Sequence, residues 1–128
     1  MRTLPNAESK REATYSGPAP APWFAADAMR WIVERGVASL VVDLPSLDRA
    51  DDGGRLAAHR LYWGLPPGSV DSREATRGQA LVTELAYVPD AVRDGFYLLN
   101  LQVASFATDA APSRPVIYAT HEITMAQP

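Results

Sequence analysis

The sequence predicts a single α/β domain, in which a mixed sheet has helices packed beside it. A helical pattern over 25–35 leads through a glycine into an apolar, valine-rich run over 37–43. Helix, tight turn and buried strand in succession are typical of α/β proteins. The chain length agrees, because 128 residues of which 47% are hydrophobic are enough for one core and too few for two comfortable ones.

The helix predicted over 25–35 has an amphipathic spacing and a clear end. Gly36 follows it, and glycine is the residue that most easily takes the left-handed conformation that ends a helix. Arg30 and Glu34 are spaced to pair on the solvent face. The apolar residues that share the opposite face, at i, i+3 and i+4, are Ala28, Trp31 and Ile32.

The remaining elements are predicted from short apolar runs between polar, proline- and glycine-rich stretches. The expected elements are a strand over 37–43, one or two helical turns over 55–64, and strands over 80–85, 96–106 and 116–120. Residues 1–22 are polar and rich in proline, which predicts an extended arm before the core at 23–120. The tail, 121–128, has no usable pattern.

Composition and charge exclude several classes of function. The net charge is −3 and the basic residues are scattered, so the sequence has no basic surface of the kind that binds nucleic acid. The chain has no cysteine, which excludes disulfides and thiolate ligands. Its longest apolar run, 37–42, is far shorter than a membrane span, and the N-terminus does not resemble a signal peptide. We therefore expect a cytoplasmic protein without nucleic-acid or membrane partners.

The acidic turn that begins at Asp48 does not fit a calcium-binding loop. If Asp48 is position 1 of an EF-hand, Ala50 takes position 3 and His59 takes position 12, where an oxygen ligand and a glutamate are required. Ser46 and Asp48 would form a catalytic triad with His59, but serine and aspartate after a strand are more often turn residues. The common hydrolase and phosphate-loop motifs are absent. A solvated turn is the better interpretation.

His59 and Glu84 form the more plausible pair for chemistry. Glu84 interrupts an apolar run, and a buried carboxylate needs a cation or hydrogen-bond donors; Arg114 would serve equally well. Imidazole and carboxylate together are common ligands of zinc and manganese. A hydrogen-bonded core histidine is the alternative for His59. Asp43, at the end of its strand, is expected to be either an outer-sphere neighbour of a metal or a turn residue.

Taken together, the segments "VDLPSLDR", "AAHR" and "TELAYVP" resemble the cyclase family of metal-dependent hydrolases, which includes bacterial kynurenine formamidase. The matching segments come in the family's order and cover nearly the whole chain. The resemblance implies a swivelling β/β/α fold and hydrolysis of an N-formyl or cyclic amide. It also implies a divalent zinc or manganese ion, with His59 and Glu84 as ligands, and assembly into homo-oligomers.

The sequence departs from this family in one respect. The family's ligand-rich stretch, of the form H-x-G-T-H-x-D, does not occur in the chain, which resembles only the C-terminal half of such an enzyme. Two hypotheses therefore remain. The chain is an arylformamidase-like hydrolase, or it is a catalytically incomplete domain with only a structural or oligomerisation role.

Overall fold

The computed structural model describes residues 1–16 and 21–120, and these residues fall into two compact units, Met1–Asp90 and Ala91–Pro128. Each unit is considered by itself below. The expected tail, with His121, lies outside the described residues. Within the described ranges, the helices are all too short or too polar to cross a bilayer.

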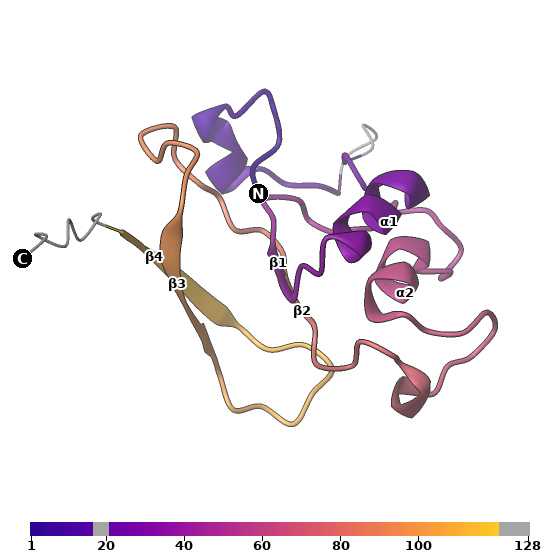
Figure 1. Cartoon of the computed structure of the whole chain (residues 1–128). Coiled ribbons are helices and arrows are strands. Elements are labelled where there is room, and N and C mark those ends of the chain that lie inside the picture. The colour runs from indigo at the N-terminus through magenta and orange to yellow at the C-terminus, as the bar shows by residue number, and fades with distance from the viewer. Residues whose placement is uncertain (17–20, 121–128) are drawn as a thin grey trace, which may run out of the picture. The chain divides into compact units, whose positions relative to one another are not determined.

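The first unit packs two short helices beside a two-stranded parallel sheet (Figure 1). Its elements are η1 (Glu8–Glu12), α1 (Ala26–Glu34), β1 (Ser39–Val41), α2 (Ala57–Trp63), η2 (Ser72–Glu74) and β2 (Leu81–Thr83). Helices α1 and α2 lie against one another, and β1 pairs with β2. The predicted helices and strands of this unit are confirmed, while η1 places a turn of 3-10 helix inside the arm that was expected to be extended.

The pairing of β1 with β2 continues beyond the two strands and shapes the chain around Glu84. The Val42 amide donates to the Thr83 carbonyl oxygen at 2.9 Å, and the Ala86 amide donates to the Val42 carbonyl oxygen at 2.8 Å. Between these bonds, Leu85 takes a left-handed conformation with φ of 58°. Such a φ is rare for a leucine and shows that the local backbone is constrained by its surroundings.

A compact apolar core lies between the helices and the sheet. The residues that share full burial there are Met29, Ile32, Leu40, Val42, Leu44, Leu47, Ala58 and Tyr62. Burial of apolar surface on this scale is the main favourable contribution to folding. The core therefore includes β1, the turn after it and one face of each helix.

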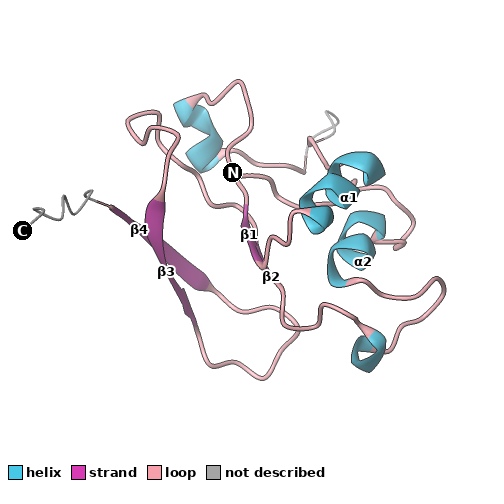
Figure 2. Cartoon of the chain, in the orientation of Figure 1, coloured by secondary structure: helices cyan, strands magenta, loops and turns pink. Residues whose placement is uncertain are grey.

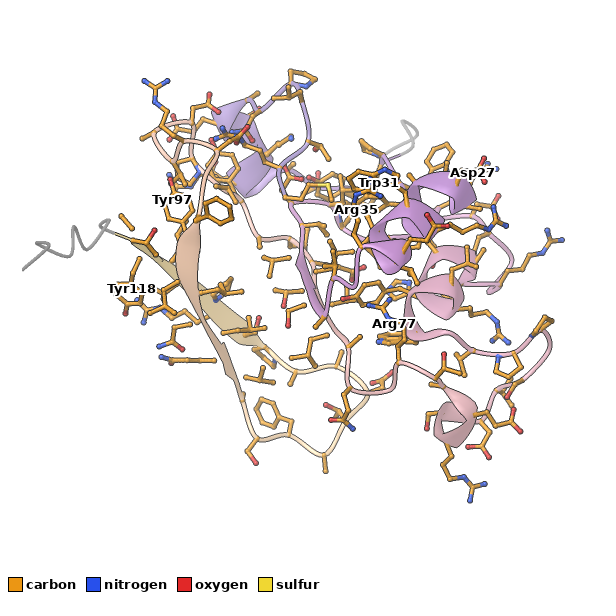
Figure 3. All side chains as sticks on the ribbon, viewed as in Figure 1. Asp27, Trp31, Arg35, Arg77, Tyr97 and Tyr118 are labelled. Carbon is orange, nitrogen blue, oxygen red and sulfur yellow. The ribbon has the colours of Figure 1, made fainter. Side chains whose placement is uncertain are left out.

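The stripe predicted for α1 is partly wrong. Ile32 is buried as expected, but the inner face is completed by Met29, whereas Trp31 is 53% exposed. The guanidinium of Arg35 lies 3.4 Å from the centroid of the Trp31 ring, which accounts for the exposed position of the ring (Figure 3). Arg30 pairs with Asp27 at 2.5 Å and not with Glu34.

Tyr62 anchors α2 through its hydroxyl group as well as its ring. The side chain is fully buried, and its hydroxyl oxygen lies 3.1 Å from the carbonyl oxygens of both Val37 and Leu81. Arg77 lies over the ring and donates to the Tyr62 carbonyl oxygen at 2.6 Å. These contacts hold α2 against β2 and against the segment just before β1.

Replacing Tyr62 by phenylalanine should lower the free energy of unfolding by about 1 kcal/mol, because a buried hydrogen bond is lost and the ring is kept. Urea unfolding followed by circular dichroism would measure the change. Tyr118→Phe is the control, since Tyr118 is 53% exposed, and it should change stability by less than about 0.5 kcal/mol. Equal effects in the two variants would contradict the anchoring role.

The segment before α1 is fastened to the end of β1 by Asp43. The carboxylate accepts the Thr3 amide at 3.0 Å and the ammonium of Lys10 at 2.9 Å. Lys10 also donates to the Thr3 carbonyl oxygen at 2.7 Å. The side chain of Asp43 is 1% exposed, so this ion pair lies largely out of solvent. Asp43 thus fixes a segment more than 30 residues away in sequence.

The second unit is an antiparallel hairpin of β3 (Tyr97–Val103) and β4 (Ser113–Ala119) (Figure 2). Leu99 faces Ile117 across the two strands. Both predicted strands are confirmed, with β4 beginning three residues earlier than expected. None of the described residues of this unit, 91–120, is buried, and Phe96 is 93% exposed.

The described fold is therefore a small mixed α/β arrangement with short sheets and two α-helices. This confirms the predicted class. The two sheets differ in type, since β1 and β2 run parallel whereas β3 and β4 run antiparallel.

Candidate metal centre

The fold brings together three titratable side chains from separate parts of the first unit. His59 lies on α2, Glu84 follows the end of β2, and Asp48 lies in the turn after β1. His59 Nε2 is 3.3 Å from Glu84 Oε1, and His59 Nδ1 is 2.7 Å from Asp48 Oδ2. The two residues singled out from the sequence are thus neighbours, although 25 positions separate them.

Glu84 is held by the backbone as well as by the histidine. Its Oε1 accepts a hydrogen bond from the Leu47 amide at 2.8 Å. Leu47 is fully buried, and its own carbonyl oxygen accepts from the Phe24 amide at 2.9 Å. The Glu84 side chain is 28% exposed, so one end of this carboxylate is fixed by a buried element while the group remains accessible.

Asp48 is the site residue that sequence reasoning assigned to a solvated turn. It is 7% exposed, and its two oxygens accept the amides of Ala58 at 2.6 Å and His59 at 3.2 Å. It therefore caps the first turn of α2 from a distant loop, in addition to its contact with the His59 ring. One feature of the sequence could have indicated this role: α2 has no capping side chain at its own N-cap, so an acceptor from elsewhere in the chain is needed.

The start of α2 is unusual because Leu56 occupies the N-cap position. Leu56 has φ of 48°, and no side chain at that position accepts a hydrogen bond from the helix. Asp52 compensates through one oxygen that accepts the Leu56 amide at 2.6 Å and another that accepts the Gly54 amide at 2.7 Å. The acidic turn thus supplies hydrogen-bond acceptors for the start of the helix.

The surroundings of His59 favour a positive charge on or beside the ring. Burial by itself lowers the pKa of His59, but hydrogen bonds and negative charge from Glu84 and Asp48 outweigh it and raise the pKa above its usual value. The indole ring of Trp63 lies tilted beside the imidazole, with 5.2 Å between ring centroids, and its Nε1–H donates to the Ala80 carbonyl oxygen at 2.9 Å. The imidazole of His59 is therefore in contact with Asp48, Glu84 and Trp63.

The 3.3 Å contact between His59 and Glu84 is that of a direct ion pair, as expected for a hydrogen-bonded histidine, and the same separation also fits two ligands of one metal ion. Zinc binds imidazole nitrogen and carboxylate oxygen at about 2.0–2.2 Å, so neighbouring tetrahedral ligands lie about 3.3–3.5 Å apart. Both side chains also have the supporting hydrogen bonds that metal ligands usually have, from Asp48 and from the Leu47 amide. Among residues 1–16 and 21–120, however, no group of three or more such side chains converges on one point. The pair fits as part of a ligand set.

The other candidates from the sequence have different roles. Ser46 Oγ accepts from the Asp48 amide at 3.2 Å, which is the contact of a turn residue. Asp43 is more than a turn residue, because it binds Thr3 and Lys10. His121 lies outside the described residues.

A cavity lies at the carboxyl ends of β1 and β2 and has a volume of about 310 Å³. Its lining residues are Lys10, Arg11, Ala13, Asp43, Leu85 and Tyr87. Ligands of open α/β sheets commonly bind outside the carboxyl ends of the strands. The cavity contains charged, aromatic and apolar side chains, a mixture that suits a small polar molecule.

Comparison with known proteins adds no family to these observations, since no family model, no curated protein and no solved structure matches the sequence.

Proposed function

We propose that the chain carries part of the metal site of an amide hydrolase of the cyclase family, with His59 and Glu84 as metal ligands. The observation that carries this proposal is the 3.3 Å separation of His59 Nε2 and Glu84 Oε1. The resemblance of "AAHR" and "TELAYVP" to the family's segments supports the same two residues. Zinc and manganese both suit an imidazole and a carboxylate.

The reaction is hydrolysis, in which water adds to an amide and releases a carboxylic acid and an amine; an N-formyl amide releases formate. A divalent ion, when bound, polarises the amide carbonyl and makes water a better nucleophile at neutral pH. The chain's own contribution is to hold two ligands rigidly, His59 through α2 and Glu84 through the Leu47 amide. We place the small-molecule substrate in the cavity beside Leu85.

The finer fold belongs to the same proposal. The parallel pair β1–β2, with α1 and α2 packed beside it, suits the C-terminal half of a swivelling β/β/α domain. Protein zinc sites usually have three or four protein ligands. We therefore assign the remaining ligands to a polypeptide segment with the family's H-x-G-T-H-x-D stretch. As a separate part of the proposal, we place the protein in the cytoplasm.

The test is Zn²⁺ binding by calorimetry on the purified chain, with His59→Ala as the variant and His121→Ala, at the chain's other histidine, as the control. Wild type and the control should bind one ion per chain. The affinity of His59→Ala for Zn²⁺ should be lower by more than about 100-fold. Removing a residue that only supports a ligand lowers metal affinity about 10–100-fold, and removing the ligand itself should have a larger effect. Formate release from N-formylkynurenine, with Zn²⁺ or Mn²⁺ present, is the second measurement. It is made on a polypeptide that also contains the H-x-G-T-H-x-D segment, and it should be lost in the same variant.

Two outcomes would overturn the assignment. The first is that His59→Ala and His121→Ala bind Zn²⁺ equally well. The second is that metal binding depends on His59 but Glu84→Gln leaves it unchanged, which would remove the carboxylate from the ligand set.

The exposed hairpin favours a second candidate, a structural domain that assembles into homo-oligomers. Isolated two-stranded hairpins are marginally stable, and among the described residues neither β3 nor β4 pairs with a third strand. Large apolar side chains on the hairpin are also exposed, including Leu98, Ile117 and Tyr118. Light scattering after gel filtration would detect the oligomer. A stable oligomer without metal binding or hydrolysis would favour this candidate over the hydrolase.

A further inference from the structure

Asp48 has an environment that a solvated turn does not explain. Its side chain is 6% exposed, and burial of a carboxylate is costly unless donors surround it. Three donors do so: the amides of Ala58 and His59, and the Nδ1 side of the His59 ring at 2.7 Å. The first two contacts cap the helix. The third reaches the candidate metal ligand directly.

The contact with Nδ1 determines which ring nitrogen is available for bonding. Both ring nitrogens face a carboxylate, and an ionised carboxylate only accepts hydrogen bonds. When the ring is neutral and has one proton, the shorter contact, 2.7 Å from Nδ1 to the more deeply buried Asp48, favours the proton on Nδ1. The other nitrogen, Nε2, then has a lone pair, and this nitrogen faces Glu84 Oε1 at 3.3 Å. A lone pair and a carboxylate oxygen that face each other are the arrangement of two ligands on either side of a shared cation.

We infer that Asp48 is a positioning residue that holds His59 as the Nδ1–H tautomer and aims Nε2 at Glu84, where the metal ion would bind. The inference rests on the proposed function for the identity of the ion but not for the tautomer. Asp48 acts through His59 and touches neither metal nor substrate. Oδ1 of Asp48 accepts the Ala58 amide, whereas Oδ2 accepts the His59 amide and contacts the ring. An experiment can therefore change the group opposite the ring and keep the shorter of the two contacts that cap the helix.

The discriminating variant is Asp48→Asn. The amide keeps one oxygen, which can still accept the Ala58 amide, and it places an NH₂ group opposite Nδ1. Nδ1 then becomes an acceptor, and the proton moves to Nε2. Asp52→Asn is the matched control, because Asp52 caps the same turn through Gly54 and Leu56 and has no contact with the His59 ring among its described hydrogen bonds.

The first measurement is ¹⁵N NMR of the histidine ring without metal, at a pH above the pKa of His59, in a His121→Gln background that leaves one histidine. The parent chain and Asp52→Asn should show the Nδ1–H tautomer, whereas Asp48→Asn should show Nε2–H. The second measurement is Zn²⁺ affinity, which should fall about 10–100-fold in Asp48→Asn and little in Asp52→Asn.

The outcomes separate this inference from the proposed function. If the parent chain shows the Nε2–H tautomer, the inference is wrong. This measurement needs no Asp48 variant, so the inference can be tested even if Asp48→Asn does not fold. An Nδ1–H ring that Asp48→Asn leaves unchanged also overturns it, and so does an equal loss of Zn²⁺ affinity in the Asp48 and Asp52 variants. A tautomer that switches in a chain that binds no Zn²⁺ supports the positioning role and counts against the metal site.

Discussion

Replacing Leu47 by alanine is expected to lower the free energy of unfolding by about 2–5 kcal/mol, the cost of removing a large side chain from a packed core. Leu47 is 0% exposed and belongs to the apolar core, which also contains residues of α1, α2 and β1. A loss of this size is a large part of the stability of a typical small domain, about 5–15 kcal/mol. Chemical denaturation followed by circular dichroism would measure it.

Leu47 also links the core to the candidate metal centre, because its amide donates to Glu84 and its carbonyl oxygen accepts from Phe24. The matched control is Val70→Ala, an apolar truncation at a side chain that is 94% exposed, and it should change stability by less than about 0.5 kcal/mol. A loss below about 1 kcal/mol in Leu47→Ala would show that this turn does not belong to the core.

Replacing Asp43 by asparagine should destabilise the first unit by about 3 kcal/mol at neutral pH, because a largely buried ion pair loses one partner. Asp43 holds the Thr3 amide and the Lys10 ammonium, and Lys10 is itself only 20% exposed. The matched control is Asp27→Asn, which removes the carboxylate of an ion pair whose aspartate is 95% exposed. That variant should change stability by less than about 0.5 kcal/mol.

The pH dependence gives a further measurement of the same contact. Burial raises the pKa of Asp43, but hydrogen bonds from Thr3 and Lys10 outweigh it, and the pKa is lowered overall. A carboxylate with a lowered pKa in the folded state stabilises the protein above its pKa in the unfolded chain, about 4. This contribution is lost as the pH falls through the folded-state pKa. The difference between wild type and Asp43→Asn should therefore shrink in acid, and a difference that is constant down to about pH 2 would contradict this account.

Local pattern was sufficient to predict most elements of the fold. The glycine after α1 and the valine-rich run of β1 are local features of the sequence, and the helix and strand that they predicted were confirmed within a few positions. Trp31 was placed wrongly because two faces of α1 have similar apolar spacing, and a sequence does not show which one meets the core. Met29 is on the face that does, while Arg35 covers the exposed ring.

The candidate site was only half predictable for a related reason. His59 and Glu84 were noticeable individually, as a histidine beside apolar residues and a carboxylate in an apolar run. Asp48 looked like a turn residue, and it is one. Its contact with the His59 ring depends on the way the turn after β1 folds back on α2, which the composition of the turn does not encode. The role of Asp43 was missed likewise, because its partners lie 33 and 40 residues away.

The two left-handed leucines lie next to the two candidate ligand segments, Leu56 before α2 and Leu85 directly after Glu84. A left-handed conformation costs a leucine roughly 1–2 kcal/mol, so the native contacts must exceed that cost at both places. Replacing either leucine by glycine would relieve the backbone strain of the folded state. It would also raise the conformational entropy of the unfolded chain, so the two effects on the free energy of unfolding oppose one another. A design that aims to raise the thermal stability of this protein should therefore keep Leu56 and Leu85 and place its substitutions on the exposed faces of the helices.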